Sequence, residues 1–88
     1  MAVIDHLTDG DLAARIKVKL AAGELPMHGP LEVFGGPSRG GECCACGERI
    51  AAAEAELEVS AVDGVQRVYH PRCFVILTRA RRASAAGN

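Results

Sequence analysis

The chain has 88 residues, a formal net charge of −1 and only three aromatic side chains, and alanine supplies much of its apolar content. Many domains this short need a metal, disulfides or a partner to be stable, and with so few bulky side chains we expect such a staple here. Its charge argues against a strongly basic, generic binder of nucleic acid. No apolar stretch approaches the roughly 20 residues of a membrane helix, and no basic start precedes the apolar residues 1–4. We therefore expect a cytoplasmic location and no membrane contact.

The first predicted element is a helix that follows a loose lead-in over residues 1–7. Thr8 or Asp9 can cap this helix, which runs to about Ala22, and Gly23 is the expected C-terminal cap. Its apolar stripe repeats every four residues and consists of Leu12, Ile16 and Leu20. A helix this short is unstable alone, so its stripe must pack on the rest of the chain. The expected receiving surface consists of Leu57, Val59, Phe74 and Leu77.

Residues 24–42 are rich in Gly and Pro and predict a loop that joins the helix to the second half of the chain. Leu31–Phe34 predicts a short strand that ends at the turn signal Gly35-Gly36-Pro37. We assign residues 1–42 to this helix and loop, 43–83 to a compact metal-binding unit and 84–88 to a flexible tail.

The second half of the chain predicts a hairpin followed by a helix. Residues 54–59 alternate between glutamate and apolar side chains, which is typical of a half-buried strand whose acidic face is exposed. Asp63-Gly64 is a hairpin turn signal, and residues 65–69 form the expected return strand. Pro71 suits the first turn of a helix, which we expect to run to about Arg82.

Four residues have the spacing of a zinc site, C-x2-C-x23-H-x2-C, namely Cys43, Cys46, His70 and Cys73. Three cysteines and one histidine form a common structural zinc set, and thiols in a reducing compartment favour metal over disulfides. Cys44 competes with Cys43 as the first ligand, but Gly47 directly after Cys46 favours the C-x2-C register. Cys44 is then a free thiol. The sequence therefore predicts one structural Zn²⁺ ion.

The order of knuckle, hairpin and helix is that of a treble clef. Residues 43–74 resemble the zinc fingers of poly(ADP-ribose) polymerases and DNA ligases, in which H-x2-C is also followed by an aromatic residue, here Phe74. The first half of a LIM domain is similar. The gap between the ligand pairs here is shorter than in the polymerase finger and longer than in LIM.

The resemblance implies a small α+β, treble-clef-like zinc fold, preceded here by an N-terminal helix. It implies no binding of DNA breaks, because the basic and aromatic surfaces for that activity are missing. The layout as a whole resembles that of short bacterial proteins, which implies no function.

Two function classes fit this pattern, and an enzyme is not expected because no nucleophile motif, phosphate loop or acid–base pair stands out. The first is a non-catalytic protein-interaction or regulatory module. The second is a nucleic-acid-binding transcriptional regulator that uses the basic last helix. The expected contacts to an anionic partner are Arg79, Arg82, Lys17 and Lys19. Arg72 is expected to balance the thiolate charge, and Arg81 to lay its stem on apolar surface with its head in water.

Overall fold

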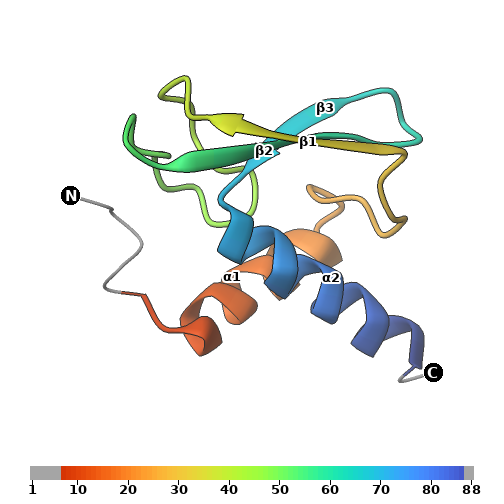
Figure 1. Ribbon diagram of the computed structural model, residues 1–88. Helices are drawn as coiled ribbons and strands as arrows, with labels where there is room; N and C mark the ends of the chain where they lie inside the picture. The colour runs from red at the N-terminus through yellow and green to blue at the C-terminus, as the bar shows by residue number, and fades with distance from the viewer. Residues whose placement is uncertain (1–6, 87–88) are drawn as a thin grey trace.

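The computed structural model describes residues 7–86, and it contains two helices and one antiparallel sheet. The elements follow in the order α1 (Asp9–Ala21), β1 (Glu32–Pro37), β2 (Ala55–Ser60), β3 (Gln66–Tyr69) and α2 (Pro71–Ala86). The predicted lead-in over residues 1–6 and the end of the predicted tail, residues 87–88, lie outside the described residues. Neither helix is long and apolar enough to cross a bilayer. Figure 1 shows the sheet as one layer and the two helices as a second layer against it.

Helix α1 begins and ends as the sequence predicts. Thr8 is its N-cap: the Thr8 side chain accepts the Asp11 amide, and the Asp11 carboxylate accepts the Thr8 amide, both at 3.0 Å. This capping box satisfies two of the backbone donors that a helix start leaves free. Gly23 follows the last helical turn at φ 77°, in the left-handed region that favours glycine. The amide of Glu24 donates back to the Lys19 carbonyl at 2.9 Å, which closes the helix end.

The sheet has the strand order β1-β2-β3, and its first strand differs from the prediction. Gly35, Gly36 and Pro37 continue β1 instead of ending it, and Pro37 pairs with Ala55. Glycine and proline are tolerated here because β1 is an edge strand, whose outer side needs no amide donors for a neighbour. The Leu57 side chain also lies over Gly35, since a Cβ there would be 3.6 Å from Leu57 Cδ2. Pairing with β2 therefore overrides the local turn signal.

The predicted hairpin forms between β2 and β3, but the acidic face of β2 is not simply exposed. Gly64 makes the turn at φ 80°. Val59 is buried as expected, whereas Ala55 of the same face is exposed. Glu56 is only 5% exposed, and the Arg39 amide donates to its Oε1 at 3.0 Å. The expectation of a solvated glutamate face is wrong at this residue.

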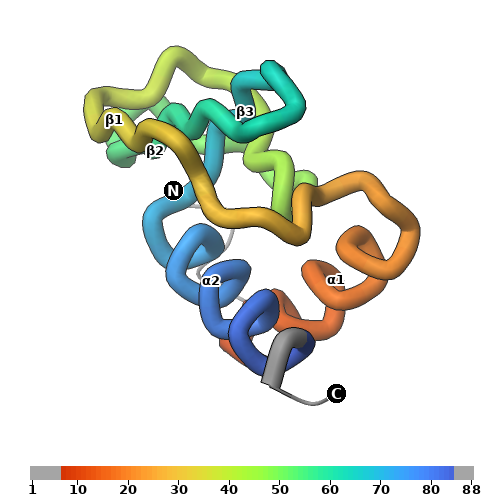
Figure 2. Tube along the Cα trace, turned by 90° about the vertical axis from the view of Figure 1, so that its right-hand side faces the viewer, coloured from red at the N-terminus to blue at the C-terminus, as the bar shows by residue number. Residues whose placement is uncertain are grey.

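The apolar stripe of α1 is buried in one core with α2 and the sheet, as predicted. Leu12, Ile16 and Leu20 share this core with Val59 and Leu77. The other two predicted receivers pack at its margin, Leu57 and Phe74. The structure adds central side chains that the sequence analysis did not select, namely Leu25, Ile50, Tyr69 and Ile76. Figure 2 shows α1 and α2 side by side beneath the sheet.

Helix α2 ends later than predicted. It continues to Ala86, so residues 84–86 belong to the helix and not to a flexible tail. Alanine and serine continue a helix that already has three turns, because propagation adds one hydrogen bond per residue at little cost. The helix is thus 16 residues long and begins at Pro71 as expected.

Candidate metal centre

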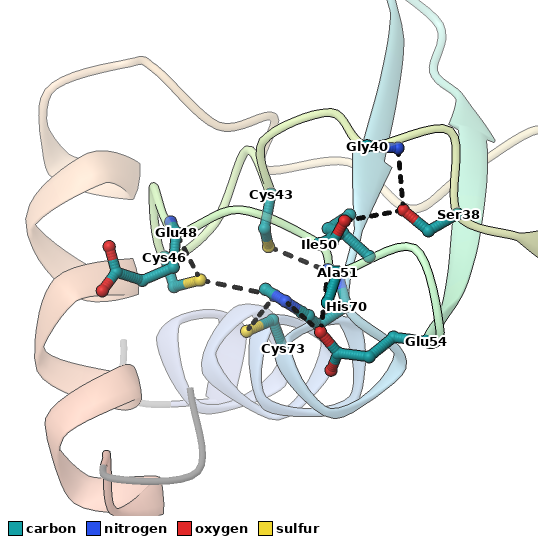
Figure 3. Close-up of polar contacts among 10 residues, drawn as sticks. All are labelled: Ser38, Gly40, Cys43, Cys46, Glu48, Ile50, Ala51, Glu54, His70 and Cys73. Carbon is teal, nitrogen blue, oxygen red and sulfur yellow. Dashed lines mark hydrogen bonds and ion pairs between the residues drawn. The ribbon is translucent and has the colours of Figure 1, made fainter. Parts of the chain in front are cut away.

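Cys43, Cys46, His70 and Cys73 converge on one buried point. Their ligand atoms all lie within 4.8 Å of one another, and none of the four residues is more than 4% exposed. Figure 3 shows the three sulfur atoms around the His70 ring. Two of the cysteines come from the loop before β2, the histidine from the junction between β3 and α2, and the third cysteine from the first turn of α2. The spacing in the sequence therefore identifies a real cluster in space, one that could hold a single metal ion.

The first pair of cysteines is held by a tight turn. Gly47 takes φ 79°, and its amide donates to the Cys43 carbonyl at 2.9 Å. The Glu48 amide then points at Cys46 Sγ, at 3.4 Å. A bridge between Glu42 and Arg49 closes the base of the turn. This geometry is the reason that glycine is needed after the second cysteine, and it supports the register that begins at Cys43.

The second pair lies at the junction between β3 and α2. His70 is the single residue between Tyr69, which ends β3, and Pro71, which begins α2, and Cys73 follows within the first turn of the helix. The Phe74 amide donates to the His70 carbonyl at 3.0 Å, so His70 is fixed as the residue from which the helix starts. The His70 amide in turn points at Cys43 Sγ, at 3.4 Å. One backbone group thus links the two halves of the site.

The distances from His70 to two of the sulfur atoms are close to those around a tetrahedral ion. Zinc bonds of about 2.3 Å to sulfur and about 2.0 Å to nitrogen place neighbouring ligand atoms about 3.5–3.8 Å apart in a tetrahedron. His70 Nδ1 lies 3.5 Å from Cys46 Sγ and 3.9 Å from Cys73 Sγ. The Nδ1 atom, rather than Nε2, therefore faces the ion position.

The three thiols are too close to ionise together without a cation. Hydrogen bonds from the Cys46 and Cys73 thiols lower the pKa of the Cys43 thiol far below its usual range. Sharing a proton with Cys43 raises the pKa of both Cys46 and Cys73. Metal ligands must be thiolates. A divalent cation at the centre would remove this conflict, since it compensates the charge that three neighbouring thiolates create.

Glu54 is a site residue that the sequence analysis did not identify. Its Oε1 lies 3.9 Å from His70 Nε2 and accepts the Ala51 amide at 2.9 Å. Nε2 is buried without a hydrogen-bond partner in the described part of the chain. At 3.9 Å the contact is too long for a hydrogen bond, but a negative charge beside the outer nitrogen of a ligating histidine makes the ring a better ligand. The sequence carries no signal for this contact, because the alternation of residues 54–59 only places Glu54 among the acidic side chains.

Cys44 lies outside the cluster, as predicted. It is half-buried, and its backbone joins the knuckle to the sheet through an amide that donates to the Val68 carbonyl at 2.9 Å. The four ligands thus use three of the chain's four cysteines.

Basic side chains of α1 hold the knuckle from the helix side. Arg15 Nη1 donates to the Cys46 carbonyl at 2.9 Å, and Lys19 Nζ donates to the Cys44 carbonyl at 3.0 Å. Lys19 therefore has a structural role, which its assignment as a partner contact did not anticipate. These two bonds attach α1 directly to the turn that carries two of the metal ligands.

Two arginines of α2 also have roles other than those predicted. Arg72 pairs with a carboxylate that the prediction did not foresee: its Nε donates to Asp9 at 2.8 Å, which joins the starts of the two helices. Arg81 is not a solvated head on an apolar stem. It is 8% exposed, its Nε donates to the Pro26 carbonyl at 2.8 Å, and burial lowers its pKa. The buried guanidinium thus supplies a donor to the loop after α1.

The remaining predicted contacts, Lys17, Arg79 and Arg82, are exposed. Lys17 and Arg79 line the same groove between α1 and α2, whose lining also includes Asp9, Ala13, Ile76, Ala80 and Ala83. Arg82 lines a separate groove beside Gly29 and Pro30.

Comparisons of the chain with protein families, with curated proteins and with solved structures find no match.

Proposed function

We propose that this protein is a non-catalytic binding module built around one structural zinc ion, and that its partner is another protein. The observation that carries the proposal is the closed Cys3His cluster, whose four ligands are all buried. A catalytic zinc site keeps one coordination position open for water or substrate. Here the protein itself supplies four ligands, so the ion would hold the fold together and leave function to the surface.

The donor set favours zinc over other metals. Tetrahedral sites of thiolate and imidazole select zinc, whereas calcium, magnesium and manganese prefer oxygen ligands. The order of knuckle, hairpin and helix, with ligands at the knuckle and at the helix start, supports a treble-clef-like fold. In this chain α1 and β1 are added to that arrangement, one beneath the knuckle and one at the sheet edge.

Metal content tests this part of the proposal. Native mass spectrometry of the purified protein should find one zinc ion per chain. Cys43→Ser should lose the ion, and Cys44→Ser, the matched neighbour, should keep it. An iron–sulfur absorbance, or a folded protein without metal, would show that the assignment is wrong.

The groove between α1 and α2 supports a protein partner with acidic residues. Its floor is made of small and aliphatic side chains, and its volume is about 240 Å³. Lys17 and Arg79 line the groove with two positive charges, and the one carboxylate in its lining, Asp9, is paired with Arg72. An amphipathic helix with carboxylates beside an apolar face would match both features. Charge reversal with Lys17→Glu and Arg79→Glu should abolish capture of such a partner without changing zinc content.

A nucleic-acid-binding regulator is the second candidate, because Arg79 and Arg82 are exposed and neighbour each other on α2. Gel shifts with random duplex and single strands at low and high salt test it. The pair Arg79→Ala and Arg82→Ala should then weaken binding to all sequences and flatten the salt dependence by about one slope unit per lost phosphate contact. If no nucleic acid binds at low salt, this candidate is refuted.

A further inference from the structure

Strand β1 has a free edge. It lies at the outer side of the sheet, away from β3, and no strand in residues 7–86 pairs with its other side (Figure 2). The Ser38 amide donates to the Glu54 carbonyl at 3.0 Å in the same register as the strand pair. Because hydrogen-bonded pairs alternate along antiparallel strands, Phe34 and Gly36 direct their backbone groups to β2. Val33 and Gly35 direct theirs outward, and none of the hydrogen bonds among the described residues uses those groups.

Nothing in the described part of the chain covers this edge. All six residues of β1 are exposed, and Phe34 is 58% exposed. A Cβ on Gly36 would meet no atom within 4 Å, so the backbone is open to close approach. Native proteins usually protect such edges with charge, bulges or a covering segment. A straight edge with two exposed apolar side chains and two glycines is therefore suited to receive another strand.

A groove beside this edge carries negative charge. It has a volume of about 380 Å³ and is lined by Phe34, Arg39, Glu56 and Glu58, together with residues 35–38. Glu56, although 5% exposed, forms part of its wall. Glu32 lies on the same face of β1 as Phe34, two residues before it. The groove lining thus holds two carboxylates, those of Glu56 and Glu58, against the one guanidinium of Arg39. The exposed Phe34 side chain also lines the groove, where it can pack on the stem of a lysine or arginine.

We propose that β1 binds an extended segment of a partner protein in which basic residues alternate with β-branched or apolar ones. The segment adds a fourth strand through the outward backbone groups of Val33 and Gly35. Its basic side chains enter the groove at Glu56 and Glu58, and the alternate side chains lie on the other face beside Val33. This surface is separate from the groove between the helices, so it adds a second type of partner to the proposed binding module and rests on that proposal.

A designed peptide tests the inference on the full-length, zinc-loaded protein. The probe is an acetylated and amidated ten-residue peptide that alternates lysine and threonine. In ¹⁵N-labelled protein it should shift the amide signals of Val33 and Gly35 and leave those of α1 unchanged. The same peptide with glutamate for lysine should not bind, and neither should a lysine–threonine peptide with N-methylated backbone amides.

Variants of the protein separate the two parts of the surface. Glu58→Lys should weaken peptide binding roughly tenfold or more, because it places like charges together. Glu24→Lys, at an exposed site in the loop after α1, should leave binding unchanged. Val33→Pro removes an outward amide, spares the bonds to β2 and should also abolish binding.

Three results would overturn the inference. These are equal binding of the acidic peptide, binding that survives N-methylation, and a concentration-dependent dimer in sedimentation that Val33→Pro abolishes, since a second copy would then occupy the edge. Zinc content measured on the same samples keeps this result distinct from the proposed function: a zinc-loaded, folded protein that ignores the peptide refutes only the β1 site.

Discussion

Removal of the metal should unfold the whole chain, including α1, and not only the unit that carries the ligands. The reason lies in the core. Three of its fourteen buried residues are ligand cysteines, and Tyr69 is its only aromatic member among the described residues. Helix α1 has 13 residues and is too short to be stable alone. It is attached to the knuckle by Arg15 and Lys19 and packs its stripe on the same core.

The magnitudes support this expectation. A chain of this length has a net stability of roughly 4–13 kcal/mol at about 0.05–0.15 kcal/mol per residue. Structural zinc contributes about 10 kcal/mol or more in small zinc folds. The metal-free chain should therefore be at or below the balance point between folded and unfolded states. No part of the fold has enough separate core to remain.

The assay is titration with a strong chelator, followed by circular dichroism and by methyl NMR of Ile16. Both helices should lose their signal in one transition, and added zinc should restore it. Cys73→Ser should reproduce the metal-free spectrum, while Cys44→Ser should match the wild type. Two separate transitions, or Ile16 methyl signals that keep their native shifts after chelation, would refute the argument that α1 depends on the metal centre.

Three further predictions concern single side chains. Ile16→Ala should destabilise the protein by about 2–4 kcal/mol in chemical denaturation because Ile16 is fully buried, while Val18→Ala, at a site 68% exposed, should have little effect. Arg81→Ala should cost about 1.5–3 kcal/mol, since it removes a charged donor from the Pro26 carbonyl, whereas the exposed neighbour Arg82 should tolerate the same change in the same assay. Glu54→Gln should weaken zinc binding by roughly tenfold in chelator competition with the fold intact, because it removes the carboxylate charge beside His70 Nε2. An unchanged zinc affinity would mean that Glu54 acts only on the Ala51 amide.

The parts of this structure that the sequence predicts depend on local rules. The capping box at Thr8, the glycine after α1 and the turn at Gly64 all follow from the preferences of single residues. The ligand set follows from the spacing of two short motifs, C-x2-C and H-x2-C, because each spacing places two ligands on one side of an ion. The apolar stripe of α1 was predictable for the same reason, since its period is that of one helix.

The structure differs from the prediction where a segment distant in the sequence determines the secondary structure or the burial of a residue. The local sequence at Gly35 and Gly36 predicts a turn, and only their pairing with β2 makes them part of a strand. The alternation predicts that Glu56 is exposed, and it does not reveal that the Arg39 amide supplies a partner for the buried carboxylate. The helical pattern predicts that the Arg81 guanidinium lies in water, and only its bond to the Pro26 carbonyl explains its burial. In each case a backbone group far away in the sequence supplies the partner, and no local pattern carries that information.

The basic residues of α1 show that a cluster of positive charges beside a candidate metal centre can bond the centre's own loop instead of an external partner. With a divalent ion bound, the three thiolates would leave the site with a net charge of −1, and this charge would stabilise cations close to the knuckle. Arg15 and Lys19 donate to two carbonyls of the knuckle, and the Lys19 ammonium would lie 3.9 Å from a Cβ at Gly47. These two positive charges therefore belong to the fold. Of the basic residues in this helix, Lys17 is the one left for an external partner, and it lines the groove with Arg79. A basic cluster beside a predicted thiolate site should thus first be assigned to charge compensation within the chain, and only the members that face away should be assigned to binding.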